Sequence, residues 1–128
     1  MKKEIKKLVR YWQKELRLRD WIVSCEVVTN LEDDEGNTLL GQNVTLLEEK
    51  RAVILIKDPS IVKEEAKGDA FFRYHPNAFD VERVVVHELL HLFFEEYNTS
   101  SNPVPLEQAI NILANKLVTD KYLKGETK

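Results

Sequence analysis

Apolar residues in the first part of the chain recur three or four positions apart, with lysines and arginines between them. Residues at this spacing lie on one side of an α-helix, so the pattern predicts an amphipathic helix that ends before Asp20. The charged side indicates a solvated surface, and binding to a membrane surface is the alternative. The apolar residues of this stripe are Ile5, Leu8, Val9, Trp12 and Leu16.

The next part of the chain has the composition of three β-strands. Apolar and polar residues alternate within residues 21–28, which indicates a half-buried strand. Residues 39–47 and 52–56 predict two more strands joined by a charged turn. Because Val53–Ile56 has no polar member, we expect this strand to be covered on both faces.

Three helices are predicted after the strands. A short one follows Asp58, and a longer one over residues 81–97 begins after the N-cap residue Asp80. A loop then leads to a last helix that starts near Leu106. This order predicts an α+β fold, with a small mixed or antiparallel sheet of about three strands packed against the N-terminal, middle and C-terminal helices. The length, 128 residues, fits one domain over residues 1–128.

Composition narrows the possible partners and compartment. The net charge of -3 argues against nucleic acid as the main partner, because phosphate binding needs a basic surface. No stretch approaches the roughly 20 apolar residues of a membrane span. The chain has one cysteine, Cys25, and no signal-peptide pattern, so a cytoplasmic protein with a buried thiol is expected.

The candidate chemistry lies in the segment His87-Glu88-Leu89-Leu90-His91. Two histidines four residues apart lie on one helix face and can bind one tetrahedral zinc ion. The intervening Glu88 lies beside such an ion without binding it, where it can act as general base toward a metal-activated water. The alternative is two histidines in the protein core, but burying them with a carboxylate among apolar neighbours costs several kcal/mol unless a cation is bound.

A third ligand has to come from elsewhere, and Glu107 in the first turn of the last helix is the preferred candidate. Glu95 lies ~12 Å along the helix axis from His87, which is too far. Asn111, one turn after Glu107, is a candidate hydrogen-bond partner for a metal-bound histidine. A surface glutamate and an exposed helix residue are the alternatives for these two residues. Reserve ligands are Glu96 and His75.

The segment from Val84 to Phe93 resembles the extended signature of zincin metallopeptidases, and Glu107 followed by Asn111 resembles the downstream motif of the gluzincin branch. The small size is similar to minimal gluzincins and to metallopeptidase-like proteins of bacteria and their phages. The metzincin branch is excluded, because it would need glycine and histidine where Phe94 and Tyr97 stand.

The resemblance implies a zinc-dependent peptidase with a peptide or protein substrate. It also implies that the backbone of Val53–Ile56 binds an extended peptide by strand addition, with burial of this strand inside the protein as the competing interpretation. His75 and Tyr97 are candidate donors to the oxyanion of the reaction. A turn residue before Pro76 and a half-buried aromatic at a helix end are the respective alternatives.

The sequence therefore predicts peptide-bond hydrolysis with His87, His91 and Glu107 as zinc ligands and Glu88 as base. The first alternative is a catalytically silent, metal-stabilised binding module of a phage or toxin–antitoxin type. A metal-free interaction protein is the second alternative. Cobalt or manganese in place of zinc is also compatible with the sequence, although two histidines and one carboxylate suit zinc.

Overall fold

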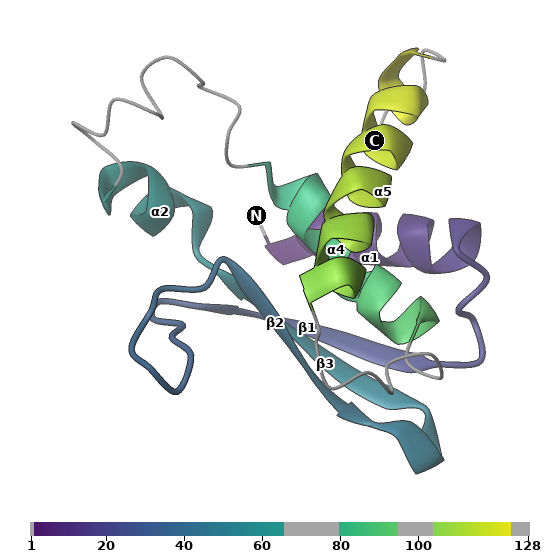
Figure 1. Cartoon of the computed structure of the whole chain (residues 1–128), viewed down its shortest axis with the longest axis horizontal. Coiled ribbons are helices and arrows are strands. Elements are labelled where there is room, and N and C mark those ends of the chain that lie inside the picture. Colours follow the sequence, from purple (N-terminus) through teal and green to yellow (C-terminus); the bar gives the residue numbers. More distant parts are fainter. Residues whose placement is uncertain (1, 66–79, 95–103, 124–128) are drawn as a thin grey trace.

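The computed structural model describes residues 2–65, 80–94 and 104–123. These residues form an α+β fold, as the sequence predicted (Figure 1). The elements in chain order are α1 (Lys2–Glu15), β1 (Ile22–Val28), β2 (Gly41–Leu46), the 3-10 turn η1 (Leu47–Glu49), β3 (Arg51–Lys57), α2 (Pro59–Glu65), α4 (Val81–Phe93) and α5 (Val104–Leu123).

The three strands form one mixed sheet in the order β1-β3-β2. Strand β3 pairs parallel with β1 and antiparallel with β2, so that Ile54 lies between Cys25 and Asn43. Because β3 has a neighbour on each side, its backbone is not available to a further strand. The expectation that Val53–Ile56 binds a peptide by strand addition was therefore wrong. Among the described residues, the edge strands of this sheet are β1 and β2.

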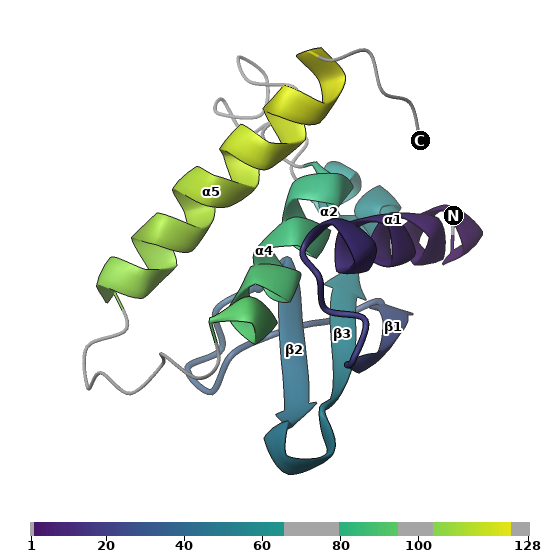
Figure 2. The ribbon, with the colours of Figure 1, turned by 90° about the vertical axis from the view of Figure 1, so that its right-hand side faces the viewer.

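Helices α1 and α4 cover one face of the sheet, and α5 packs on α4 (Figures 1 and 2). Side chains of β3 alternate accordingly: Ile54 and Ile56 are buried, whereas Val53 and Leu55 point to the other face and are partly exposed. The prediction that this strand is covered on both faces was wrong. A run without polar residues does not reveal that α1 and α4 both cover the same face of the sheet.

The core lies between this helix layer and the sheet. The predicted apolar stripe turns inward: its residues on α1 are buried, and Leu16, just after the end of α1, is partly exposed. Cys25 faces α1 from β1, and burial raises the pKa of its thiol to about 11. The most completely buried apolar side chains are Ile5, Ile54, Ile56, Val85, Val86, Leu89, Ile110 and Val118.

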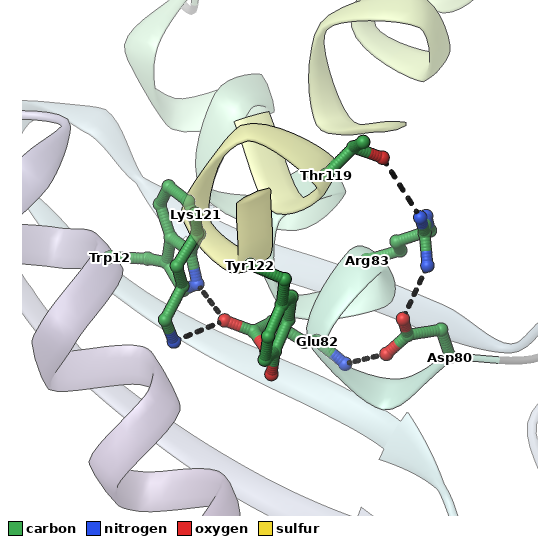
Figure 3. Close-up of polar contacts among 7 residues, drawn as sticks. All are labelled: Trp12, Asp80, Glu82, Arg83, Thr119, Lys121 and Tyr122. Carbon is green, nitrogen blue, oxygen red and sulfur yellow. Dashed lines mark hydrogen bonds and ion pairs between the residues drawn. The ribbon is translucent and has the colours of Figure 1, made fainter. Parts of the chain in front are cut away.

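A buried polar cluster fixes the three long helices to one another. The Glu82 carboxylate of α4 accepts hydrogen bonds from Trp12 Nε1 and Lys121 Nζ, both 2.7 Å long, and from the Tyr122 hydroxyl (Figure 3). Burial alone would raise the pKa of Glu82, but these hydrogen bonds outweigh it and lower the pKa below its usual value. The cluster therefore holds a charged carboxylate where α1, α4 and α5 meet.

A second set of polar contacts joins the start of α4 to α5. Asp80 caps α4 by accepting a hydrogen bond from the backbone N–H of Glu82, as expected of an N-cap. Its other oxygen pairs with Arg83 at 2.5 Å, and Arg83 also donates to Thr119 on α5 at 3.2 Å (Figure 3). Both sets of contacts orient α5 relative to α4.

None of the described helices is both long and apolar enough to cross a membrane.

Candidate metal centre

His87 and His91 lie one turn apart on α4 and turn their rings to the same side. Their Nε2 atoms are 3.2 Å apart, and the ring centroids are separated by 5.0 Å. Neighbouring ligands of a tetrahedral zinc ion at about 2.0 Å lie roughly 3.3 Å from each other. The two imidazole nitrogens thus already have the separation that a shared ion requires.

Glu107 reaches both histidines from the first turn of α5. Its Oε1 lies 2.7 Å from His87 Nε2, and its Oε2 lies 3.1 Å from His91 Nε2. The ligand atoms of these three residues all fall within 4.8 Å of one another, so the group could hold a metal ion. Two imidazoles and one carboxylate are a donor set that suits a divalent cation, which binds the neutral form of histidine and the ionised form of a carboxylate.

The group is partly open to solvent on the side of a pocket. The exposed fractions of the side chains are 20% for His87, 24% for His91 and 45% for Glu107. The pocket, with a volume of about 380 Å³, lies between α4, α5 and the segment that leads into β2. Its lining includes Leu40, Gly41, Arg83, His87, Glu88, Glu107 and Asn111. This opening leaves space for a water molecule or substrate beside His87 and Glu107.

Glu88 is buried, with 6% of its surface exposed, yet its carboxylate borders the same pocket. Asn43 of β2 donates a hydrogen bond of 2.9 Å to Glu88 Oε1. Burial raises the pKa of Glu88, while the two neighbouring histidines and the Asn43 hydrogen bond act in the opposite direction. The carboxylate thus lies next to the candidate metal ligands and is held by a residue of the sheet.

Gly41 brings β2 close to α4 at this point. A Cβ atom added to Gly41 would lie 2.5 Å from Val84 Cγ1 and 3.1 Å from Glu88 Oε2, so a larger residue does not fit without a shift. Sequence reasoning did not single out Gly41 or Asn43. The available signal was that small or polar residues occupy alternate positions of a predicted strand.

The other predicted site residues stand as follows. Asn111 is exposed on α5 and lines the pocket with His87 and Glu107, but within the described ranges it makes no hydrogen bond to either histidine. Its predicted role stays a prediction. His75 and Tyr97, the candidate oxyanion donors, lie outside the described residues, and so does the reserve ligand Glu96.

No protein-family model, curated protein or solved structure matches the chain. The resemblance to zincins therefore depends on the residues themselves, namely the histidine pair, Glu88 and Glu107. Independently of that resemblance, the chain is a small α+β protein in which two histidines of one helix and a glutamate of the next form a group that could hold a metal ion.

Proposed function

We propose that the protein is a zinc-dependent peptidase in which His87, His91 and Glu107 hold the metal and Glu88 acts as the general base. The observation that carries this proposal is the convergence of three ligand atoms within 4.8 Å, beside a pocket that Glu88 also lines. Two imidazoles and one carboxylate with an open fourth position are the donor set of catalytic rather than structural zinc sites.

Each residue has a distinct task in the proposed reaction. Bound zinc would supply a Lewis acid that polarises the scissile carbonyl and makes a water molecule more acidic. Glu88 takes the proton from the attacking water and then delivers it to the leaving amine. Glu88 follows His87 on the helix, stays outside the ligand group and lines the same pocket as His87 and Glu107, which supports this role.

The free edge of β2 is the proposed place for the substrate backbone. Within the part of the chain that the structure describes, strand β2 pairs only with β3, and its first residue, Gly41, lines the pocket with His87 and Glu88. An extended peptide can add to such an edge through main-chain hydrogen bonds, which bind many sequences. Peptide binding at β2 replaces the site that had been expected on Val53–Ile56.

The proposal is tested by digesting a peptide library with the zinc-loaded wild type, the chelator-treated protein and the Glu88→Gln variant. We expect cleavage by the zinc-loaded wild type only. The variant should bind zinc as the wild type does but turn over at least ~100-fold more slowly, since it lacks the proton acceptor.

Two results would contradict the proposal. Cleavage that persists in Glu88→Gln would remove Glu88 from the reaction. Zinc binding at one ion per chain without any cleavage would favour the silent, metal-stabilised binding module instead.

A further inference from the structure

Strand β2 turns small and polar residues toward α4, whereas its two apolar residues are exposed to solvent. Gly41, Asn43 and Thr45 share the face that α4 covers, because they pair with the core residues Ile56, Ile54 and Ala52 of β3. Val44 and Leu46 face outward and are 56% and 58% exposed. A strand with one buried face normally has the opposite arrangement. The inverted pattern indicates that something under β2 requires polar neighbours.

That group is the Glu88 carboxylate. Asn43 Nδ2 lies 2.9 Å from Glu88 Oε1 and 3.5 Å from the backbone oxygen of the same residue. Oε2 lies on the side of Gly41, which lines the pocket. One oxygen of the carboxylate is therefore engaged by the sheet, and the other lies where the strand leaves space for it.

We propose that Asn43 is a positioning residue that fixes the orientation of the Glu88 carboxylate, so that Oε2 is the oxygen presented to the pocket. This inference rests on the proposed peptidase function, in which Glu88 is the base. The Asn43 side chain donates to only one oxygen of the carboxylate, so it distinguishes the two oxygens of a group that could otherwise rotate about its last torsion. A general base contributes fully only when its acceptor atom is held within hydrogen-bonding reach of the proton it takes.

The first test separates turnover from binding. Asn43→Ala removes the donor, and Asn43→Asp keeps the shape but replaces the donor by an acceptor. With a peptide that the wild type cleaves, we expect both variants to lower kcat by about 10- to 100-fold with KM and zinc content unchanged. Ser24→Ala is the matched control, because Ser24 is a polar residue of the same sheet on its outer face.

A second measurement needs no substrate and no metal. In the metal-free protein, Asn43→Ala and Glu88→Ala should change the unfolding equilibrium constant non-additively, by threefold or more, because each substitution removes one partner of the hydrogen bond between the two side chains. If the wild type cleaves nothing while this coupling is present, the peptidase proposal fails and the contact between Asn43 and Glu88 stands.

Three outcomes would overturn the inference. One is a wild-type kcat in Asn43→Asp, since the donor would then be dispensable. Another is a loss of activity in Asn43→Ala that only parallels loss of zinc or of folded protein. The third is strict additivity of Asn43→Ala and Glu88→Ala in the metal-free protein.

Discussion

Lys121 of α5 and Glu82 of α4 form an ion pair of 2.7 Å in which the two side chains are only 2% and 1% exposed. A pair removed from water in this way is stabilising only while both members are present, because either charge alone is poorly solvated. Since Glu107 belongs to the same helix as Lys121, the pair also fixes the orientation of the helix that brings the third candidate ligand to the histidines.

Glu82→Gln is therefore expected to destabilise the protein by about 3–5 kcal/mol, because it leaves the Lys121 charge buried without a counter-ion. Urea unfolding at pH 7 measures this loss. The control is Asp20→Asn, which removes the partner of Lys50 in a pair whose side chains are 56% and 50% exposed and should cost under about 1 kcal/mol. Equal losses in the two variants would show that burial does not determine the strength of the Glu82 pair.

Acid should remove the stabilisation that the charged Glu82 carboxylate gives to the folded protein. Its pKa in the folded protein is lowered from 4.5, so the folded state prefers the charged form. This stabilisation is present above the pKa of the unfolded chain and is lost as the pH falls through the folded pKa. We expect the difference in unfolding free energy between wild type and Glu82→Gln to be constant at neutral pH and to shrink below about pH 4.5. If the stability difference between the two proteins instead grows in acid, the pKa of Glu82 is raised in the folded protein and not lowered.

Gly41→Ala should disturb the site because the new Cβ would overlap the Val84 side chain at 2.5 Å. Overpacking of this kind costs typically 1–3 kcal/mol. Val84→Ala removes the clashing atom. In that background we therefore expect Gly41→Ala to cost much less stability than it does in the wild type. Thermal unfolding of the four proteins gives the comparison. If Gly41→Ala is as stable as the wild type, the close approach of β2 to α4 is not as described.

Glu107→Gln should weaken zinc binding by more than about 100-fold, since the neutral amide is a poor replacement for a carboxylate ligand. Competition with a chromogenic chelator measures the affinity. Gln108→Ala is the matched control, because Gln108 is the exposed neighbour of Glu107 on α5. Equal affinities of wild type and Glu107→Gln would exclude Glu107 from the ligand set.

The parts of the site that follow from local spacing could be predicted from the sequence. His87 and His91 share a helix face because of the helix repeat, and Asp80 is an N-cap because of its chemistry and place. Glu107 could be inferred because the loop before α5 is long enough for that helix to return toward the histidines. The structure places its carboxylate against both of them.

What could not be predicted depends on how separate elements pack. Nothing local to Val53–Ile56 reveals that β3 is the central strand, so strand addition was expected at a strand that has a neighbour on each side. The alternation of Val44 and Leu46 would by itself direct these residues to the core, whereas the structure turns the partly buried Asn43 toward α4, where it donates a hydrogen bond to Glu88. Such exceptions to patterning are expected near functional groups.

X-ray absorption at the zinc edge of the stoichiometric complex tests the proposed metal centre most directly. We predict two imidazoles and carboxylate or water oxygens at about 2.0 Å around one ion per chain, with one imidazole lost in His91→Ala. Two results would contradict the assignment of His87, His91 and Glu107 as the ligands. One is a protein that retains no zinc, and the other is a sulfur atom, from Cys25, at about 2.3 Å from the zinc ion.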